Sequence, residues 1–265
     1  MEKNRYSTKR KLTQAFLFVA LGSLGSVAVV QAGTMGLINK SWRPVLSLGG
    51  GASFVTKGGQ SQNFPIINPM TDEFYNYSAN NTAKTSGMFD AFLGIEWGIH
   101  PNWALQLGVD YNVAKSFSVN GTFLQGMDMP SADSYTYHYQ IFAQQVLAEG
   151  KLLYTVKKRF HPYLLGGIGA GFTNASNYST NVPPFLTFTR QYANNLSTSF
   201  SWAGGAGIDI DVVKHVRLGV GYRFASFGKA NLGQASINGI SVSGTLTQPN
   251  YYENQVIGQF TWMFG

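Results

Sequence analysis

The sequence predicts an all-β fold, an eight-stranded antiparallel up-and-down β-barrel that crosses a membrane with its strands. Three observations lead to this prediction. Apolar residues alternate with polar or small residues in eight segments, which is typical of strands with two different faces. Short turns alternate with long polar connections along the chain. The apolar faces carry no charges, whereas the opposite faces mix glycine with charged residues.

Composition and charge exclude several other classes of protein. Only 12% of the 265 residues are charged, against roughly 25% in soluble domains, and 14% are aromatic, which excludes disorder of the whole chain. No cysteine is present, so disulfide scaffolds and thiolate chemistry are excluded. Of the formal net charge of +7, the first eleven residues contribute +4, from five basic residues and one acidic residue. The remaining +3 is spread over the rest of the chain and does not indicate a nucleic-acid partner.

The N-terminal residues 1–32 are predicted to be a cleavable signal peptide. A basic stretch is followed by the apolar run Leu12–Val30, and Val30-Gln31-Ala32 matches the small-x-small pattern of a signal-peptidase site. An uncleaved anchor is the alternative, but the Gly and Ser residues within the run disfavour it. The barrel domain is therefore expected to occupy residues 33–265, as one domain with Gly33 at the mature N-terminus.

The first four predicted strands are Val45–Val55, Phe89–Ile99, Trp103–Val113 and Tyr135–Tyr154. The first is glycine-rich but strand-like, and the next two alternate strictly, with apolar side chains at odd-numbered positions. In the long fourth segment the alternation is expected to change parity near Gln144-Gln145, which predicts a bulge or an extension beyond the main sheet.

The other four predicted strands are Pro162–Phe172, Phe200–Val212, Val216–Phe224 and Tyr252–Phe264. The first of these is so rich in glycine that its two faces cannot be assigned. The remaining three alternate, with apolar side chains at even-numbered positions. The clear segments have 9 to 13 residues, and a tilted strand needs about 9–11 residues to cross a bilayer.

The connections between these strands differ in length in a regular way. Short turns lie at 100–102, 155–161 and 213–215, and each contains a histidine. Four long polar connections lie at 56–84, 115–134, 173–197 and 226–250. Long loops are uncommon in compact soluble domains, whereas a membrane barrel has short turns at one rim and long loops at the other.

Charged residues decide which face of the sheet is the outside. A soluble carrier barrel would place the apolar face inside, but its surface would then display many Lys and Glu residues, and these strands have almost none. Charges among glycines instead suit a narrow interior, so the apolar face is expected to meet lipid. The interior charge network is predicted to consist of Asp90, Glu96, Asp110, Glu149, Lys151, Asp209, Asp211, Arg217 and Arg223. This network either lines a pore or fills and stiffens the interior, and the narrowness of an eight-stranded barrel favours filling.

Aromatic residues cluster at the ends of the predicted strands. Such clusters are typical of the girdles that barrels place at the two membrane interfaces, although aromatic residues also favour strands in general. The predicted girdle consists of Trp97, Trp103, Tyr111, Tyr163, Trp202, Tyr222 and Trp262.

These features together resemble the small OmpA/OmpX-type outer-membrane β-barrels of Gram-negative bacteria, over most of residues 40–264. In that family the last strand ends in Phe with aromatic residues at alternate positions. Here the matching positions are Tyr252, Phe260, Trp262 and Phe264, although Gly265 follows the terminal Phe. The resemblance implies an outer-membrane location, insertion by the barrel-assembly machinery, contact with membrane lipid and lipopolysaccharide, short periplasmic turns and four long extracellular loops.

No residue set indicates a catalytic, cofactor or metal site. His100, His161 and His215 could be metal ligands or pH sensors, but we interpret them as solvated or interfacial turn residues. Asp133, Ser134 and His138 suggest a hydrolase triad only weakly, because neighbours along a strand point to alternate faces.

The function predicted from the sequence is therefore that of a structural surface platform, with adhesion or host contact through the extracellular loops. The loops contain aromatic residues among small polar ones, which suits recognition of a host or matrix ligand and equally suits loops that pack on each other. A small diffusion pore is the alternative, and an outer-membrane enzyme that hydrolyses lipid or peptide is the weaker one.

Overall fold

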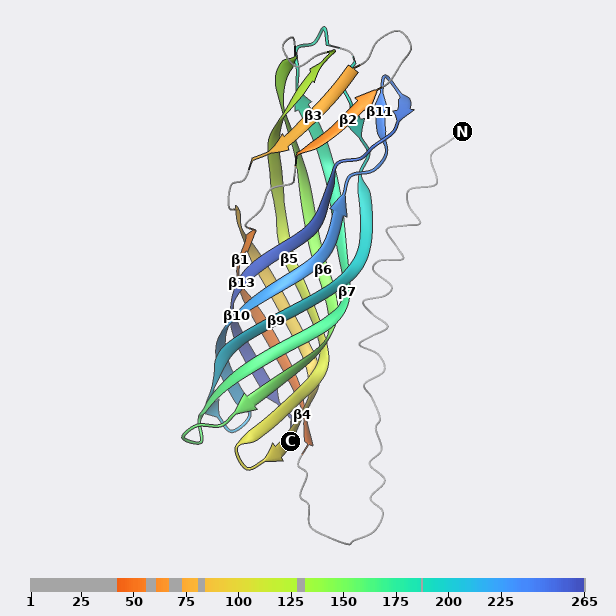
Figure 1. Ribbon diagram of the computed structural model, residues 1–265. Coiled ribbons are helices and arrows are strands. Elements are labelled where there is room, and N and C mark those ends of the chain that lie inside the picture. The colour runs from red at the N-terminus through yellow and green to blue at the C-terminus, as the bar shows by residue number, and fades with distance from the viewer. Residues whose placement is uncertain are drawn as a thin grey trace, which may run out of the picture. The chain divides into compact units, whose positions relative to one another are not determined.

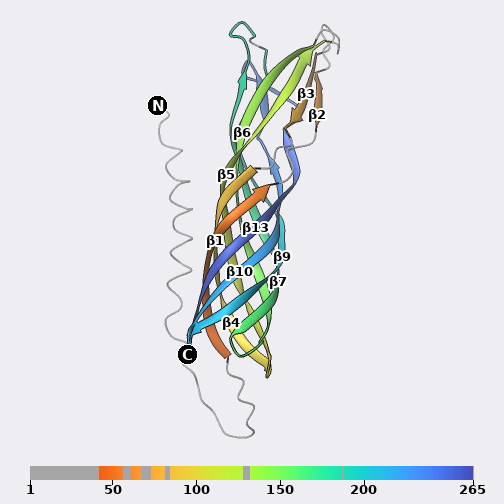
Figure 2. The same ribbon diagram turned by 90° about the vertical axis from the view of Figure 1, so that its left-hand side faces the viewer.

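The computed structural model describes residues 42–55, 61–66, 73–80, 84–127, 132–186 and 188–264. The predicted signal peptide, residues 1–32, lies outside the described residues. Eight long strands form a closed antiparallel ring in which neighbours in the chain are neighbours in space (Figures 1 and 2). In order around the ring they are β1 (Trp42–Val55), β4 (Lys84–His100), β5 (Trp103–Gly126), β6 (Asp133–Tyr154), β7 (Phe160–Asn181), β9 (Asn195–Val213), β10 (Val216–Asn231) and β13 (Thr247–Met263).

The ring confirms the predicted fold class and all eight predicted strands. It closes where β1 pairs with β13, in a continuous register from Val45 opposite Met263 to Val55 opposite Glu253. Over the length of this pairing the barrel has no free sheet edge, so the backbone groups of its strands are paired with neighbouring strands. Among the described residues no helix is long and apolar enough to span a bilayer.

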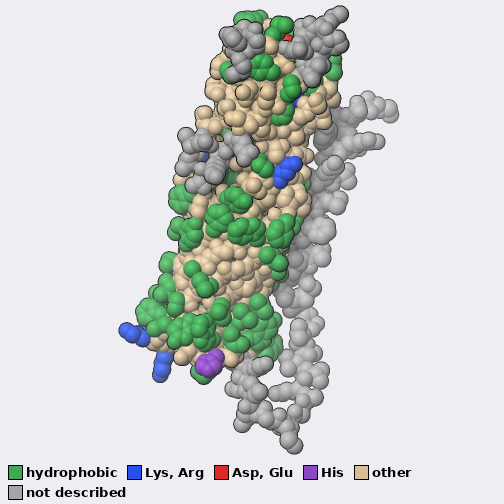
Figure 3. All heavy atoms as spheres, in the orientation of Figure 1, with side chains coloured by type: hydrophobic (Ala, Val, Ile, Leu, Met, Phe, Trp, Pro, Cys, Tyr) green, Lys and Arg blue, Asp and Glu red, His purple; other side chains and the backbone are tan. Residues whose placement is uncertain are grey.

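Side chains alternate between a charged interior and an apolar exterior. Asp110 and Arg217 are buried, whereas Trp103, Leu107 and Val109 are exposed on the outside. Figure 3 shows apolar side chains gathered around the half of the barrel nearer the short turns, with basic side chains at that end. A soluble protein would not expose such a band to water, whereas a bilayer solvates it, so the band marks the membrane-spanning part of the strands.

The strands continue well beyond the apolar band, so a large part of the four long connections is itself strand. β5 runs to Gly126, β6 begins at Asp133 and β7 runs to Asn181. Two short strands, β2 (Gln62–Ile66) and β3 (Glu73–Ala79), add to the far end of β5. A second small sheet consists of β8 (Gln191–Tyr192), β11 (Ala235–Ile237) and β12 (Ile240–Val242). We call this part of the molecule, beyond the apolar band, the extension.

The parity change expected near Gln144-Gln145 is wrong. β6 keeps one parity throughout, with odd-numbered residues from Tyr137 to Leu153 facing inward. The irregularity lies in the partner strand, where the register of β5 shifts between Ala114 and Phe117. Inward residues of β5 are even-numbered before this bulge and odd-numbered after it. One extra residue in β5 at this bulge reverses the parity, so the apolar pattern of the band and the aromatic pattern of the extension can share one strand.

Candidate functional site

Arg223 holds the central charge cluster of the interior. Its guanidinium lies 2.6 Å from a carboxylate oxygen of Asp90, 3.1 Å from Asp110 and 3.6 Å from Glu149. These acids come from β4, β5 and β6, so one side chain of β10 joins strands across the barrel. The Arg223 Nε also donates to Gln255 Oε1 at 2.8 Å. A buried guanidinium surrounded by acceptors stabilises the carboxylates only while all partners stay in place.

A second cluster lies nearer the short turns and is centred on Glu96. Arg217 and Arg43 both pair with the Glu96 carboxylate, and Gln106 donates to it at 2.7 Å. Arg217 also donates to the half-buried Asp211 at 2.7 Å. Arg43 was absent from the predicted network because it precedes the first predicted strand.

His161 corrects the interpretation that the turn histidines are solvated or interfacial. It is buried, with its ring nitrogens 2.9 Å from an Asp211 oxygen and 3.1 Å from the Thr155 hydroxyl. His100 is exposed and His215 is half-buried at the rim. The presence of a histidine in each short turn therefore does not give three equivalent sites.

Tyr163 corrects the predicted girdle. Its side chain is buried inside the barrel, where the Lys151 ammonium lies 3.8 Å from the centre of the ring. Lys151 also forms an ion pair of 2.8 Å with Asp209. The two faces of the glycine-rich strand β7 could not be assigned from its sequence. The structure shows that its odd-numbered residues around Tyr163 point inward.

Among the described residues, the middle of the interior is filled. The cavity between Asp90, Lys151 and Tyr163 has a volume of about 10 Å³, which is at the lower limit for one water molecule. Beyond the charges, an apolar layer closes the barrel with Leu147, Phe227 and Tyr251, and Phe117 stacks on Tyr251 with 5.3 Å between ring centres.

The other predicted girdle residues face outward. Trp103, Trp202, Tyr222 and Trp262 are exposed, and Trp97 and Tyr111 are half-buried on the same outer surface. Trp103 contacts Tyr154 near the turns, with 4.8 Å between ring centres, and Trp202 contacts Phe224 toward the extension at 5.6 Å. On the terminal strand, Phe260, Trp262 and Phe264 are exposed and Tyr252 is half-buried, all on one face.

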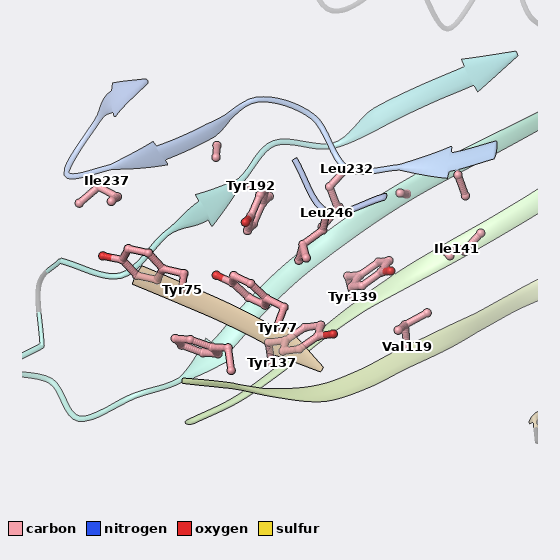
Figure 4. Close-up of a cluster of buried hydrophobic side chains, with 14 residues drawn as sticks. Tyr75, Tyr77, Val119, Tyr137, Tyr139, Ile141, Tyr192, Leu232, Ile237 and Leu246 are labelled. Atoms are coloured by element: carbon pink, nitrogen blue, oxygen red, sulfur yellow. The ribbon is translucent and has the colours of Figure 1, made fainter. Parts of the chain in front are cut away.

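The extension has an aromatic core of its own, centred on Tyr77. The Tyr77 ring lies 5.1 Å from Phe123 and 5.2 Å from Tyr137, measured between ring centres. Figure 4 shows Tyr77, Tyr137 and Tyr192 converging from β3, β6 and β8. Burial raises the pKa of Tyr137 to about 12 and that of Tyr77 further. The connections therefore pack on each other, which is the second of the two interpretations that their composition allowed. We call the packed body of the extension around this aromatic core the head.

Arg190 is a buried cation in this head that sequence reasoning missed. Its guanidinium lies 4.7 Å from the ring centre of Phe64 and 5.5 Å from that of Tyr75, and it donates to the carbonyl of Ser243. Cation–π contacts of this kind stabilise a desolvated arginine. No signal pointed to Arg190, because it lies in a connection without alternation. Glu253 was also missed, although it shares the inward face of the last strand with Gln255.

Apolar side chains are exposed at the outer end of the head. Phe185 is 81% exposed, Met127 63% and Phe188 58%. The Phe188 carbonyl accepts hydrogen bonds from Tyr75 and from Gln125, which places this residue beside the ends of β3 and β5. Met127 directly follows β5, so we call Met127, Phe185 and Phe188 the tip patch.

The residues considered for hydrolysis do not form a triad. The His138 ring lies 3.1 Å from the Ser179 hydroxyl, on the outer surface of the head. Asp133 instead accepts a hydrogen bond from Tyr135. Among the described residues, no group of three or more His, Asp or Glu residues is arranged to hold a metal ion.

Comparisons with solved structures give several barrels of low sequence identity. OprG from Pseudomonas aeruginosa is 14% identical, with 83% of this chain and 95% of that chain covered and a TM-score of 0.45. The outer-membrane protease OmpT from Escherichia coli is 10% identical, with 88% and 99% covered and a TM-score of 0.46. Ail, the attachment invasion locus protein of Yersinia pestis, is 12% identical, with 84% and 98% covered and a TM-score of 0.38. At this level the likenesses say nothing of function.

No curated protein sequence matches the chain. The family model described as outer membrane protein beta-barrel domain matches residues 20–264. This match covers nearly the whole chain, and the structure supplies the closed ring, the apolar exterior and the charged interior. The protein is an integral outer-membrane β-barrel and belongs to the outer membrane protein beta-barrel domain family.

Proposed function

We propose that the barrel is a structural platform that holds the extension outside the cell for adhesion to a host or matrix ligand. The tip patch carries this proposal. Three large apolar side chains are exposed beyond the apolar band, and the backbone of one of them, Phe188, is hydrogen-bonded to Tyr75 of the aromatic core. Rigid aromatic side chains at the centre of a contact contribute most of the binding energy in protein interfaces.

The test compares cells that display the wild-type protein with cells that display Phe185→Ser/Phe188→Ser. Attachment to immobilised fibronectin, laminin and collagen and to epithelial cell layers would be counted. We expect the double variant to lose about tenfold in apparent affinity, equivalent to about 1.4 kcal/mol. Leu196→Ser is the matched control, because Leu196 is 65% exposed but lies on the wall at the start of β9. Equal attachment of wild type and double variant, at equal surface amounts, would refute adhesion through the tip.

The filled interior supports a platform rather than a diffusion pore. Ion pairs around Arg223 and the apolar layer at Leu147 both cross the lumen. We expect no discrete conductance steps from the purified barrel in planar bilayers. Reproducible steps that change on Arg223→Gln would favour the pore.

We also infer that the aromatic face of β13 is read during barrel assembly and that the girdle fixes the barrel between lipid and lipopolysaccharide. Support comes from the shared outward face of Phe260, Trp262 and Phe264. Phe264→Ser should lower the heat-modifiable, folded fraction in the outer membrane, whereas Met263→Leu, an inward change, should not. An unchanged folded fraction in Phe264→Ser would dismiss the signal.

Export through a cleavable signal peptide at residues 1–32 is the remaining proposal, and it rests on the sequence pattern. N-terminal sequencing of the outer-membrane form should begin at Gly33. A retained Met1 would favour an uncleaved anchor.

A further inference from the structure

Two neighbouring short turns bring four basic side chains together at the periplasmic rim. The turn between β6 and β7 carries Lys157, Lys158 and Arg159, and the turn between β9 and β10 carries Lys214. β7 pairs with β9, and the Asp211 N–H donates to the Arg159 carbonyl at 2.9 Å, so the two turns are adjacent. All four side chains are exposed. We call them the basic rim.

These cations differ from those of the interior in having no carboxylate partner within the described part of the chain. Arg43, Lys151, Arg217 and Arg223 all form ion pairs, and no ion pair involves a member of the basic rim. The nearby acids Glu96 and Asp211 are already engaged by Arg43, Arg217 and His161. The basic rim therefore presents a local excess of positive charge to its surroundings.

The backbone of the first turn is strained to hold two of these lysines. Lys157 and Lys158 have φ of 50° and 61°, in a hairpin closed by hydrogen bonds between Val156 and Phe160. Consecutive left-handed residues in a hairpin turn favour Asn-Gly, and a side chain with a Cβ is disfavoured there. A strained position occupied by a residue unsuited to it suggests a role other than stability.

The aromatic belt places this charge at the level of lipid headgroups. Tyr154 and Phe160 flank the turn and are 39% and 40% exposed on the outer surface. Tyrosine and other aromatic residues mark the membrane interface, and lysine side chains beyond them reach the phosphate layer. Each basic residue near an anionic surface adds to the attraction, within a distance that salt shortens.

We propose that the basic rim binds the phosphate groups of anionic phospholipids in the periplasmic leaflet. The bound lipid holds this side of the barrel at a fixed depth and enriches anionic lipid around it. The inference concerns the rim opposite the head and is independent of adhesion.

The experiment uses the folded mature barrel, residues 33–265, in vesicles of phosphatidylcholine and phosphatidylglycerol. Dibrominated forms of either lipid quench tryptophan, and Trp42, Trp97, Trp103 and Trp262 all lie toward the turn end, as their strand register shows. We expect brominated phosphatidylglycerol to quench at least about twofold more than brominated phosphatidylcholine at equal mole fraction in low salt. The preference should vanish in 0.5 M NaCl, where the screening length is only a few ångström.

The decisive variant is Lys157→Asn/Lys158→Gly/Lys214→Gln. Asn-Gly suits the left-handed turn, so this variant should fold at least as well as the wild type while its lipid preference falls to about one. Lys115→Gln/Lys229→Gln is the matched control, because it removes exposed charges toward the opposite end and should keep the preference. Arg159→Gln/Lys214→Gln leaves the strained positions unchanged and should lower the preference in part.

Equal lipid preference in the wild type and the triple variant would overturn the proposal, and so would an equal loss in the control. A wild type without any preference would also overturn it. Sedimentation with purified peptidoglycan tests whether the basic rim binds an anionic polymer instead of anionic lipid. If the triple variant sediments less than wild type while its lipid preference is unchanged, the rim binds an anionic polymer and the lipid proposal is wrong.

Discussion

The side-chain amide of Gln62 pairs with the backbone of Thr247 as a neighbouring strand would. Its nitrogen donates to the Thr247 carbonyl and its oxygen accepts from the Thr247 N–H, both at 2.9 Å. Within the described residues β2 has β3 as its single ladder partner, so this pair ties the outer edge of the β2–β3 hairpin to the start of β13. An edge covered in this way is protected from pairing with another chain.

Gln62→Ala should therefore loosen the hairpin. We expect a loss of about 1 kcal/mol in the local stability of β2 and β3, the usual contribution of a hydrogen bond in a partly buried site. Amide hydrogen exchange of Phe64 and Tyr75 would measure it. Ser61→Ala is the control, because the Ser61–Ser78 bond is exposed and its loss should change exchange little. Unchanged exchange in Gln62→Ala would show that β3 alone holds the hairpin.

Replacing Arg223 should destabilise the barrel strongly. Arg223→Gln leaves Asp90 and Asp110 buried without a cation, which costs about 3–5 kcal/mol in the free energy of unfolding. Urea unfolding in lipid vesicles, followed by tryptophan fluorescence, gives this value. Arg43→Gln should cost about 1 kcal/mol or less, because Arg43 is partly exposed and Arg217 still pairs with Glu96. Similar losses in the two variants would contradict the assignment of Arg223 as the centre of the network.

The irregularity in the pairing of β10 with β13 should depend on Gly228. Its φ is +82°, and an added Cβ would lie 2.3 Å from the Ser199 Cβ and 2.9 Å from the Phe200 carbonyl oxygen. Gly228→Ala should lower the free energy of unfolding by about 1–3 kcal/mol, because both the backbone conformation and the space exclude a side chain. Gly87→Ala in β4 is the matched control, since nothing lies within 4 Å of its added Cβ. A loss in the control as large as that in Gly228→Ala would assign the effect to glycine replacement in strands generally.

The aromatic head should lose stability in alkali. Burial raises the pKa of Tyr137 to about 12, so the folded head favours the neutral phenol. Its contribution to stability is constant below about pH 10, where an unfolded tyrosine titrates, and falls as the pH rises from 10 to 12. Absorbance of tyrosinate at 295 nm, compared between wild type and Tyr137→Phe, isolates this group. A difference spectrum that titrates near pH 10 would show that Tyr137 is solvated.

The interior residues show what the alternation of side chains along a strand can predict and what it cannot. Asp90, Glu96 and Arg217 were placed from parity alone, because a strand with one charged and one apolar face has a single orientation compatible with lipid. The pairing of Arg223 with three acids depends on the stagger of strands around the ring, which no local pattern records. Parity also failed for Tyr163, since its strand is mostly glycine and has no contrasting faces.

The extension shows more clearly which features the sequence pattern could not predict. Its aromatic residues were visible in the sequence, but Tyr77 is buried and Phe185 is exposed although both lie in polar connections of similar composition. The bulge in β5 reverses the inward face at residues 115–116, so the band and the head obey opposite parities on one strand.

The sequence by itself determined the closed barrel, the number of strands and the inversion of apolar and charged faces. These follow from a period of two residues and from the medium that each face must meet. Only the tertiary structure decided which charges pair, that the connections fold into an aromatic head, and that four basic residues of two turns lie together. Those features arise from contacts between residues distant in the chain, whose energies depend on strand stagger and shared burial.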